Sequence, residues 1–174
     1  MSTNKKKAIT EKSDLIRKLN KASRNNQIEM DKFNDIDRVI SYFMKQWGFF
    51  AVRLSFAIIF IWFGILKPFG LSAAEPLVIK TVAWLPFLTP QTWLSIIGWW
   101  EVAIGITFLF KATTRIAIGL LFLQMAGTFM PLFLLTEITF QNNNFLLPSI
   151  EGQYIIKNLM IISGAMVIGG RVYK

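Results

Sequence analysis

Four long apolar runs constrain this chain more than any other feature of its sequence. They cover residues 47–66, 92–110, 116–136 and 153–170. Each run is close to the roughly 20 residues that a helix needs to cross the about 30 Å hydrocarbon layer of a bilayer. Apolar residue types make up 53% of the 174 residues and charged types only 17%, which is unusual for a soluble domain. We therefore predict an all-α membrane protein in which residues 47–172 form a bundle of four transmembrane helices.

The N-terminal part of the chain has a different composition. Residues 1–46 hold 11 of the 19 Lys and Arg residues and 6 of the 10 Asp and Glu residues. Residues 1–28 lack apolar periodicity and are predicted to be a disordered basic arm in the cytoplasm. Residues 29–46 are predicted to be an amphipathic helix at the membrane surface or, alternatively, a helix docked on a partner protein. The apolar stripe of this helix consists of Phe33, Ile36, Ile40, Phe43, Met44 and Trp47.

The positions of Lys and Arg predict the orientation in the membrane. With the N-terminus in the cytoplasm, that side collects the 11 basic residues of the arm together with Lys111, Arg115, Arg171 and Lys174. The outer side then carries only Lys67 and Lys80. By the positive-inside rule, both termini are predicted to be cytoplasmic in a cell inner membrane. The outer segment 67–91 is predicted to hold a short helix with apolar residues Leu77, Val78, Val82 and Leu85.

The chain contains no cysteine and no histidine. These two absences exclude disulfides, thiol redox chemistry, iron–sulfur clusters, His-ligated haem, tetrahedral zinc and His-based acid–base catalysis. The sequence therefore predicts no metal site and no catalytic residue. The net charge of +9 flanks a membrane body, so the lipid bilayer, and not nucleic acid, is the predicted partner.

Polar side chains inside the predicted spans are the candidate site residues, because a charge at that depth is costly without a partner. The candidate polar layer consists of Arg53, Lys67, Glu101, Gln124 and Lys157. Gly98 and Gly105 lie at helical spacing from Glu101, and Ala57 and Gly64 follow Arg53 in the same way, which predicts faces that pack against other helices. We expect Glu101, the only acidic residue within a span, to pair with Arg53 or Lys157.

Each of these residues also has a simpler interpretation. Arg53 and Lys157 could extend to the membrane surfaces, and Glu101 could form an ion pair with a purely structural role. Gln124 could serve only to hydrogen-bond neighbouring helices. Pro131 predicts a local kink, because it frees the carbonyl of Gly127.

Several segments resemble a known family. They are RLSFAIIFIWFGILK (53–67), AAEPLV (73–78), GWWEVAIG (98–105), TRIAIGLLFLQMAGTFMPLF (114–133) and EGQYIIKNLM (151–160). This pattern resembles the YkgB-like family of reactive chlorine resistance membrane proteins and, more distantly, the DoxX group. The resemblance implies a four-helix inner-membrane protein associated with survival of oxidant stress, without an established enzymatic activity. The family positions that carry over are Arg53, Lys67, Glu101 and Lys157.

Three functions follow as alternatives. The first is a non-catalytic or partner-dependent component of oxidative-stress defence, whose polar interior binds a small lipid-soluble molecule or stabilises a complex. The second, implied by the DoxX resemblance, is a quinone-linked oxidoreductase subunit that receives redox equivalents from a membrane or periplasmic partner. The third is a small proton- or solute-coupled transporter. Quinone is thus the one candidate cofactor, and a homo-oligomer is a further expectation.

Overall fold

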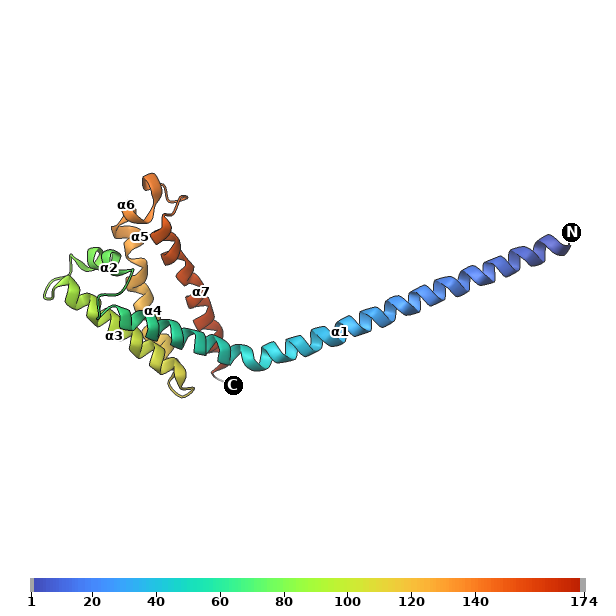
Figure 1. The fold of residues 1–174 in the computed structure, drawn as a ribbon, viewed down its shortest axis with the longest axis horizontal. Helices are drawn as coiled ribbons and strands as arrows, with labels where there is room; N and C mark the ends of the chain where they lie inside the picture. The colour runs from blue at the N-terminus through green and yellow to red at the C-terminus, as the bar shows by residue number, and fades with distance from the viewer. Residues whose placement is uncertain (1, 173–174) are drawn as a thin grey trace. The chain divides into compact units, whose positions relative to one another are not determined.

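The computed structural model describes residues 2–172, and within them every regular element is helical apart from a single β-bridge between Phe140 and Pro148. This confirms the predicted all-α class. The elements are α1 (Ser2–Leu66), α2 (Glu75–Val82), α3 (Pro90–Leu109), α4 (Thr114–Phe129), α5 (Pro131–Leu134), α6 (Thr136–Thr139), η1 (Gln141–Asn143) and α7 (Ile150–Arg171). Figure 1 shows their order along the chain.

The chain divides into two compact units, residues 1–48 and residues 49–174, and α1 contributes to both. We predicted disorder for residues 1–28, whereas the structure has these residues helical from Ser2 onward. Residues 1–47 contain neither glycine nor proline, so nothing in them interrupts a helix. The amphipathic stretch 29–46 is helical as well, and its apolar side chains from Met30 to Trp47 are exposed. The position of this stretch on a membrane surface stays a prediction.

Four helices are long and apolar enough to cross a membrane, which indicates a multi-pass membrane protein. The candidate spans are Lys32–Leu66, Pro90–Leu109, Thr114–Leu134 and Ile150–Arg171. The predicted runs agree with the last three to within three residues at either end. The first candidate span contains the whole predicted run 47–66 and ends with it at Leu66, and α1 continues without a break on the N-terminal side of that run.

Local signals in the sequence explain where α3 and α7 begin. The Thr89 hydroxyl accepts a hydrogen bond from the Thr92 backbone N–H at 3.2 Å, and Pro90 occupies the first turn of α3. The Ser149 hydroxyl accepts one from the Gly152 N–H at 3.1 Å in the same way. Such caps satisfy backbone N–H groups that have no partner inside the helix.

At Pro131, where the sequence predicts a local kink, the structure has a break between two helices. Helix α4 stops at Phe129, and a separate short helix, α5, begins at Pro131. The carbonyl that proline leaves without its usual donor belongs to Gly127, and it accepts a hydrogen bond from the Met130 N–H at 3.2 Å. The break therefore leaves no unpaired backbone group at Gly127.

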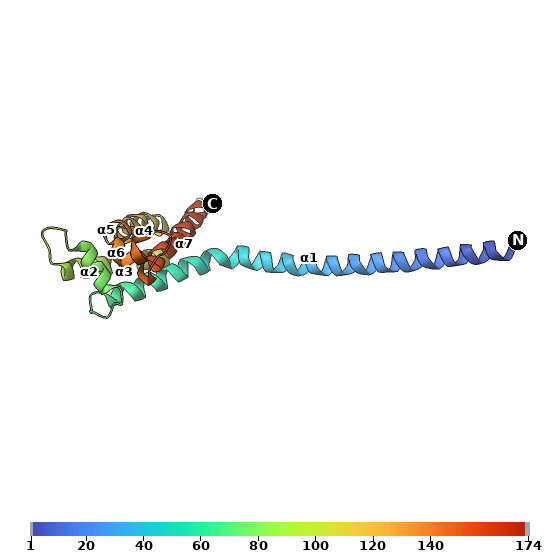
Figure 2. The ribbon, with the colours of Figure 1, turned by 90° about the horizontal axis from the view of Figure 1, so that it is seen from above.

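The short helices gather at one end of the second unit. In Figures 1 and 2, α2, α5 and α6 lie at the end opposite the α3–α4 turn and the C-terminal end of α7. Helix α2 confirms the predicted short helix in segment 67–91. One end of the second unit thus carries three short helices, and the other end carries the α3–α4 turn and the C-terminal end of α7.

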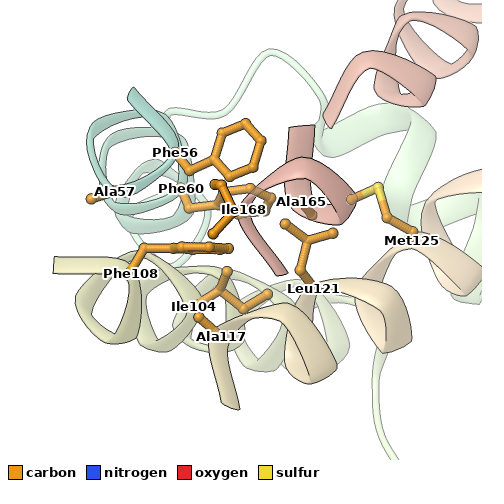
Figure 3. Packing of buried hydrophobic residues seen from close by; sticks show 10 residues of the cluster. All are labelled: Phe56, Ala57, Phe60, Ile104, Phe108, Ala117, Leu121, Met125, Ala165 and Ile168. Carbon is orange, nitrogen blue, oxygen red and sulfur yellow. The ribbon is translucent and has the colours of Figure 1, made fainter. Parts of the chain in front are cut away.

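The core of the second unit is an apolar cluster to which all four long helices contribute (Figure 3). Its members are Phe56, Ala57, Phe60, Ile104, Phe108, Ala117, Leu121, Met125, Ala165 and Ile168. The rings of Phe56 and Phe108 pack edge to face, with centroids 5.3 Å apart, a favourable aromatic geometry. This cluster holds α1, α3, α4 and α7 together, and the candidate site is built on the same four-helix frame.

Candidate functional site

Small residues bring α1 and α3 into close contact. A methyl group added at Gly98 would lie 2.7 Å from the Gly64 carbonyl oxygen, and one added at Gly105 would lie 2.9 Å from the Ala57 carbonyl oxygen. Only glycine fits where two backbones approach so closely. The prediction that the small residues around Glu101 mark a packed face is therefore confirmed.

This close contact brings Lys67 and Glu101 together. The Lys67 ammonium donates to Glu101 Oε2, and the two side chains are only 7% and 14% exposed. Lys67 Nζ also lies 3.4 Å from the Phe63 carbonyl oxygen. A cation and a carboxylate buried together compensate each other's loss of solvent. Glu101 therefore forms an ion pair, as expected, but its partner is Lys67 and not Arg53 or Lys157.

Gln124 extends the ion pair to a third helix. Its side-chain Nε2 donates to Glu101 Oε1 at 3.1 Å. The two carboxylate oxygens of Glu101 are therefore taken by different neighbours: Lys67, which directly follows the last residue of α1, and Gln124 from α4. We call Lys67, Glu101 and Gln124 the polar triad. It is a hydrogen-bonded connection between three of the four long helices.

Arg53 has a different role from the one predicted. Its Nε and Nη2 donate to the Phe108 carbonyl at 3.1 and 2.9 Å, and Nη2 also donates to the Leu109 carbonyl at 3.0 Å. These carbonyls belong to the last turn of α3, where no backbone N–H follows to pair with them. The pairing of Arg53 with Glu101 was therefore a wrong prediction, and Arg53, at 8% exposure, caps α3.

Lys157 is also separate from the polar triad. Its side chain is exposed, and its ammonium lies 5.2 Å from the centre of the Tyr154 ring on the preceding turn of α7. This is a cation–π geometry. The prediction that Lys157 pairs with Glu101 was wrong, because Lys67 already occupies the carboxylate.

A pocket of about 270 Å³ lies between α3 and α4, beside the polar triad. Its lining consists of Trp93, Ile96, Ile97, Trp100, Leu123 and Gln124. This volume is many times larger than a single water molecule needs, so the pocket has room for a small organic molecule. Ile96 and Leu123 are 42% and 63% exposed, so the pocket opens on the outer surface of the helix bundle and not into its core.

The two tryptophans of the pocket differ in their hydrogen bonding. Trp100 Nε1 donates to the Leu120 carbonyl at 3.3 Å and links α3 to α4. Trp93 Nε1 is, over the part of the chain that the structure describes, the one buried side-chain nitrogen or oxygen without a hydrogen-bond partner. A buried N–H without a partner is rare in proteins. The Trp93 residue lines the pocket, but its N–H is covered by protein atoms.

Sequence reasoning found the triad residues but missed the pocket. From the sequence, Trp93 fits an interfacial position, and Trp100 is expected to pack against neighbouring helices or lipid, with stacking on a quinone as the less favoured alternative. The signal was present, since Trp93, Ile96, Ile97 and Trp100 recur at helical spacing on one face of α3. Among the described residues, no group of three or more acidic side chains could hold a metal ion.

Comparison with known proteins identifies no relative of this chain. No protein-family model, no curated protein and no solved structure matches the chain. The similarity of its motifs to the YkgB-like family and the DoxX group therefore stays an expectation from the sequence.

Proposed function

We propose that this protein is a non-catalytic component of a cell inner membrane that binds a small lipid-soluble molecule between α3 and α4. The observation that carries the proposal is the α3–α4 pocket, which opens on the outer surface of the bundle and has the triad residue Gln124 in its lining. An apolar cleft with a small number of placed polar groups is the usual form of a small-molecule site. In a four-helix membrane bundle, such a cleft can be reached from the bilayer.

Photolabelling tests the binding part of this proposal. The purified protein in liposomes is titrated with a diazirine-bearing octanol or with its methyl ether, and the labelled residues are mapped by mass spectrometry. We expect saturable labelling of the peptide that holds Leu123 by at least one of the two probes.

Leu123→Trp should fill the pocket and abolish this labelling. Leu159→Trp is the matched control, since Leu159 is similarly exposed on α7 and does not line the pocket. Labelling that rises linearly with probe concentration and covers all lipid-facing residues would contradict the proposal.

The proposed orientation has both termini in the cytoplasm. It is supported by Lys111 in the α3–α4 turn and Arg171 at the end of α7, which place basic residues at one end of the second unit. Leu146 lies in the loop before α7 and is 87% exposed, so Leu146→Cys should react with a membrane-impermeant thiol reagent in intact cells. Lys111→Cys should react only after the cytoplasm is opened. The reverse pattern would invert the topology.

The physiological part of the proposal is a role in oxidative-stress defence together with partner proteins. It rests on the family resemblance of the motifs around Arg53, Lys67, Glu101 and Lys157. Cells that lack the gene should be more sensitive to hypochlorous acid, and the wild-type gene should restore survival. Complementation by Leu123→Trp at normal protein levels would show that the pocket has no part in this role.

A second candidate function is a subunit that binds quinone for a partner oxidoreductase. The observation in its favour is the pair of tryptophans in the pocket lining, because the planar ring of a quinone can stack on a flat indole ring. The redox equivalents would come from the partner. A short-chain ubiquinone analogue should then compete with the photolabel in the wild-type protein and lose this competition in Trp93→Leu, which removes one of the two indole rings.

A further inference from the structure

The orientation of the Gln124 carboxamide gives the pocket a defined chemistry. A carboxamide has one donor group and one acceptor oxygen. The nitrogen of Gln124 donates to Glu101, which as the carboxylate partner of Lys67 can only accept hydrogen bonds. The amide therefore cannot turn around without losing this bond. Its nitrogen stays toward Glu101, and its oxygen is the group left over.

The Gln124 side-chain oxygen is free to accept a hydrogen bond. Within residues 2–172, no described donor bonds to it. In the described part of the chain, Trp93 Nε1 is the one buried side-chain nitrogen or oxygen that lacks a partner. The Gln124 oxygen also lacks a partner but does not belong to this group, so it is not buried. The oxygen is thus unpaired but reachable, on a residue that lines the pocket.

The remaining walls of the pocket restrict the ligand further. Ile96, Ile97 and Leu123 are apolar, and the indoles of Trp93 and Trp100 add flat apolar surface. A charged ligand would lose its hydration here without a counter-charge, because Lys67 and Glu101 already neutralise each other. The pocket therefore favours an uncharged, mostly apolar molecule that carries a hydrogen-bond donor. The simplest such group is a hydroxyl.

We propose that the α3–α4 pocket selects lipid-soluble alcohols and phenols, whose O–H donates to Gln124 Oε1, and that the Lys67–Glu101 ion pair sets this selectivity by holding the amide in one orientation. This inference rests on the proposed function and names the ligand class for the same pocket. Gln124 is the binding residue, and Lys67 and Glu101 are positioning residues that need not touch the ligand.

The test compares two probes that differ only in the donor. The diazirine-bearing octanol has an O–H, and its methyl ether has the same oxygen and chain without the donor. In wild-type protein in liposomes, half-saturation of labelling at Leu123 should need roughly 2- to 10-fold less octanol than ether, as expected for one net hydrogen bond. Both concentrations are corrected for partition of each probe into the bilayer.

Two variants assign the selectivity to the amide. Gln124→Leu removes the acceptor, so the two probes should reach half-saturation of labelling at equal concentrations. Gln91→Leu is the matched control, because Gln91 is exposed at the start of α3 and lies outside the pocket. It should keep the wild-type preference for octanol.

A third variant tests the positioning role. The double variant Lys67→Met/Glu101→Gln removes both charges together, so no lone buried charge is left to unfold the bundle. Its amide at position 101 can donate as well as accept, so Gln124 is free to present its nitrogen to the pocket. The preference for octanol over ether should fall toward one, while labelling at Leu123 persists.

The outcomes separate the two proposals. If neither probe labels the pocket saturably, the proposed function is wrong. If both probes label it equally in the wild-type protein, the pocket binds ligands but the hydroxyl selectivity is wrong. A preference that survives Gln124→Leu would overturn the assignment to Gln124, and one that survives unchanged in the double variant would overturn the positioning role of the ion pair.

Discussion

Two buried cations, Arg53 within α1 and Lys67 directly after it, illustrate how different partners create different sites. Arg53 and Lys67 are almost equally buried, at 8% and 7% exposure, and each contacts α3. Arg53 donates to the carbonyls of Phe108 and Leu109 at the end of α3, whereas Lys67 pairs with the side chain of Glu101. The guanidinium has several donors in a fixed plane and suits two neighbouring carbonyls, while the ammonium acts as a compact charge. Burial of a cation therefore does not reveal its role, but the chemistry of its acceptor does.

The comparison matters because only the Lys67 contact continues to the α3–α4 pocket; Arg53 lines a separate and much smaller pocket at the end of α3. The Arg53 contact ends on backbone atoms, so its effect is limited to closing α3. The Lys67 contact passes through Glu101 to Gln124, which lines the α3–α4 pocket. We therefore expect substitutions at the Lys67 end to change both stability and binding, and substitutions at the Arg53 end to change stability alone.

The largest expected effect follows from breaking the Lys67–Glu101 pair. Glu101→Gln leaves the Lys67 ammonium buried without a counter-charge, which should lower the free energy of unfolding by about 3 to 5 kcal/mol. Denaturant unfolding of the purified protein in detergent micelles measures this loss. The double variant Lys67→Met/Glu101→Gln should recover most of it. Equal stability of Glu101→Gln and wild type would show that the ion pair is not desolvated.

The second effect concerns the close contact that brings the pair together. Gly98→Ala places a methyl group 2.7 Å from the Gly64 carbonyl oxygen and 2.8 Å from the Lys67 Cβ, so α1 and α3 must separate. Overpacking of this kind should cost about 1 to 3 kcal/mol in unfolding free energy. Gly119→Ala on α4 is the control, because a methyl group there meets no atom within 4 Å. A cost at Gly119 equal to that at Gly98 would point to general helix effects and not to the contact.

A smaller effect is expected from the contact of Arg53 with the end of α3. Arg53→Lys keeps the charge but cannot bond both carbonyls with the geometry of a guanidinium. The loss of one or two hydrogen bonds should lower the unfolding free energy by about 1 kcal/mol. Labelling of the α3–α4 pocket by the octanol probe should stay at the wild-type level. A change in that labelling would show that the two ends of the α1–α3 contact are coupled.

The smallest effect is expected from the N-terminal unit. Removal of residues 1–26 should leave the amount of protein in the membrane nearly unchanged, because the apolar cluster that holds the second unit begins at Phe56 and the partly buried residues packed against it begin at Phe49. Quantitative blotting of membrane fractions measures this amount. Loss of the protein would mean that the N-terminal part of α1 is needed for insertion or stability.

Much of the fold could be predicted because its signals are local or periodic. The apolar runs predicted the last three candidate spans to within three residues at either end, and the first run lies inside α1 and ends with it at Leu66. The segment after the first span predicted α2, and Pro131 predicted a local kink where the structure has the break between α4 and α5. The glycines around Glu101 predicted a packed face, since small residues at helical spacing have that meaning in any membrane helix.

The partner of Glu101 was decided only by the tertiary structure. The sequence puts Arg53, Glu101 and Lys157 inside the spans but does not give the shift of one helix along another, so the predicted partners of Glu101, Arg53 or Lys157, were wrong. The shift of α1 along α3 is instead set by the contact of Gly64 with Gly98, and this contact puts Lys67 at the carboxylate. Arg53 then lies at the end of α3, where the available acceptors are backbone carbonyls that no list of polar side chains contains.

The sequence by itself determined the helices, the spans and the residues that carry charge into them, because these depend on the order of side chains along one chain. The tertiary structure alone decided which charges meet and where a pocket forms. Trp93 and Trp100 line that pocket against Leu123 and Gln124 of the next helix, a relation that depends on the side chains of two packed faces together. Such relations arise from the relative rotation and shift of helices, and a pattern along a single helix does not contain them.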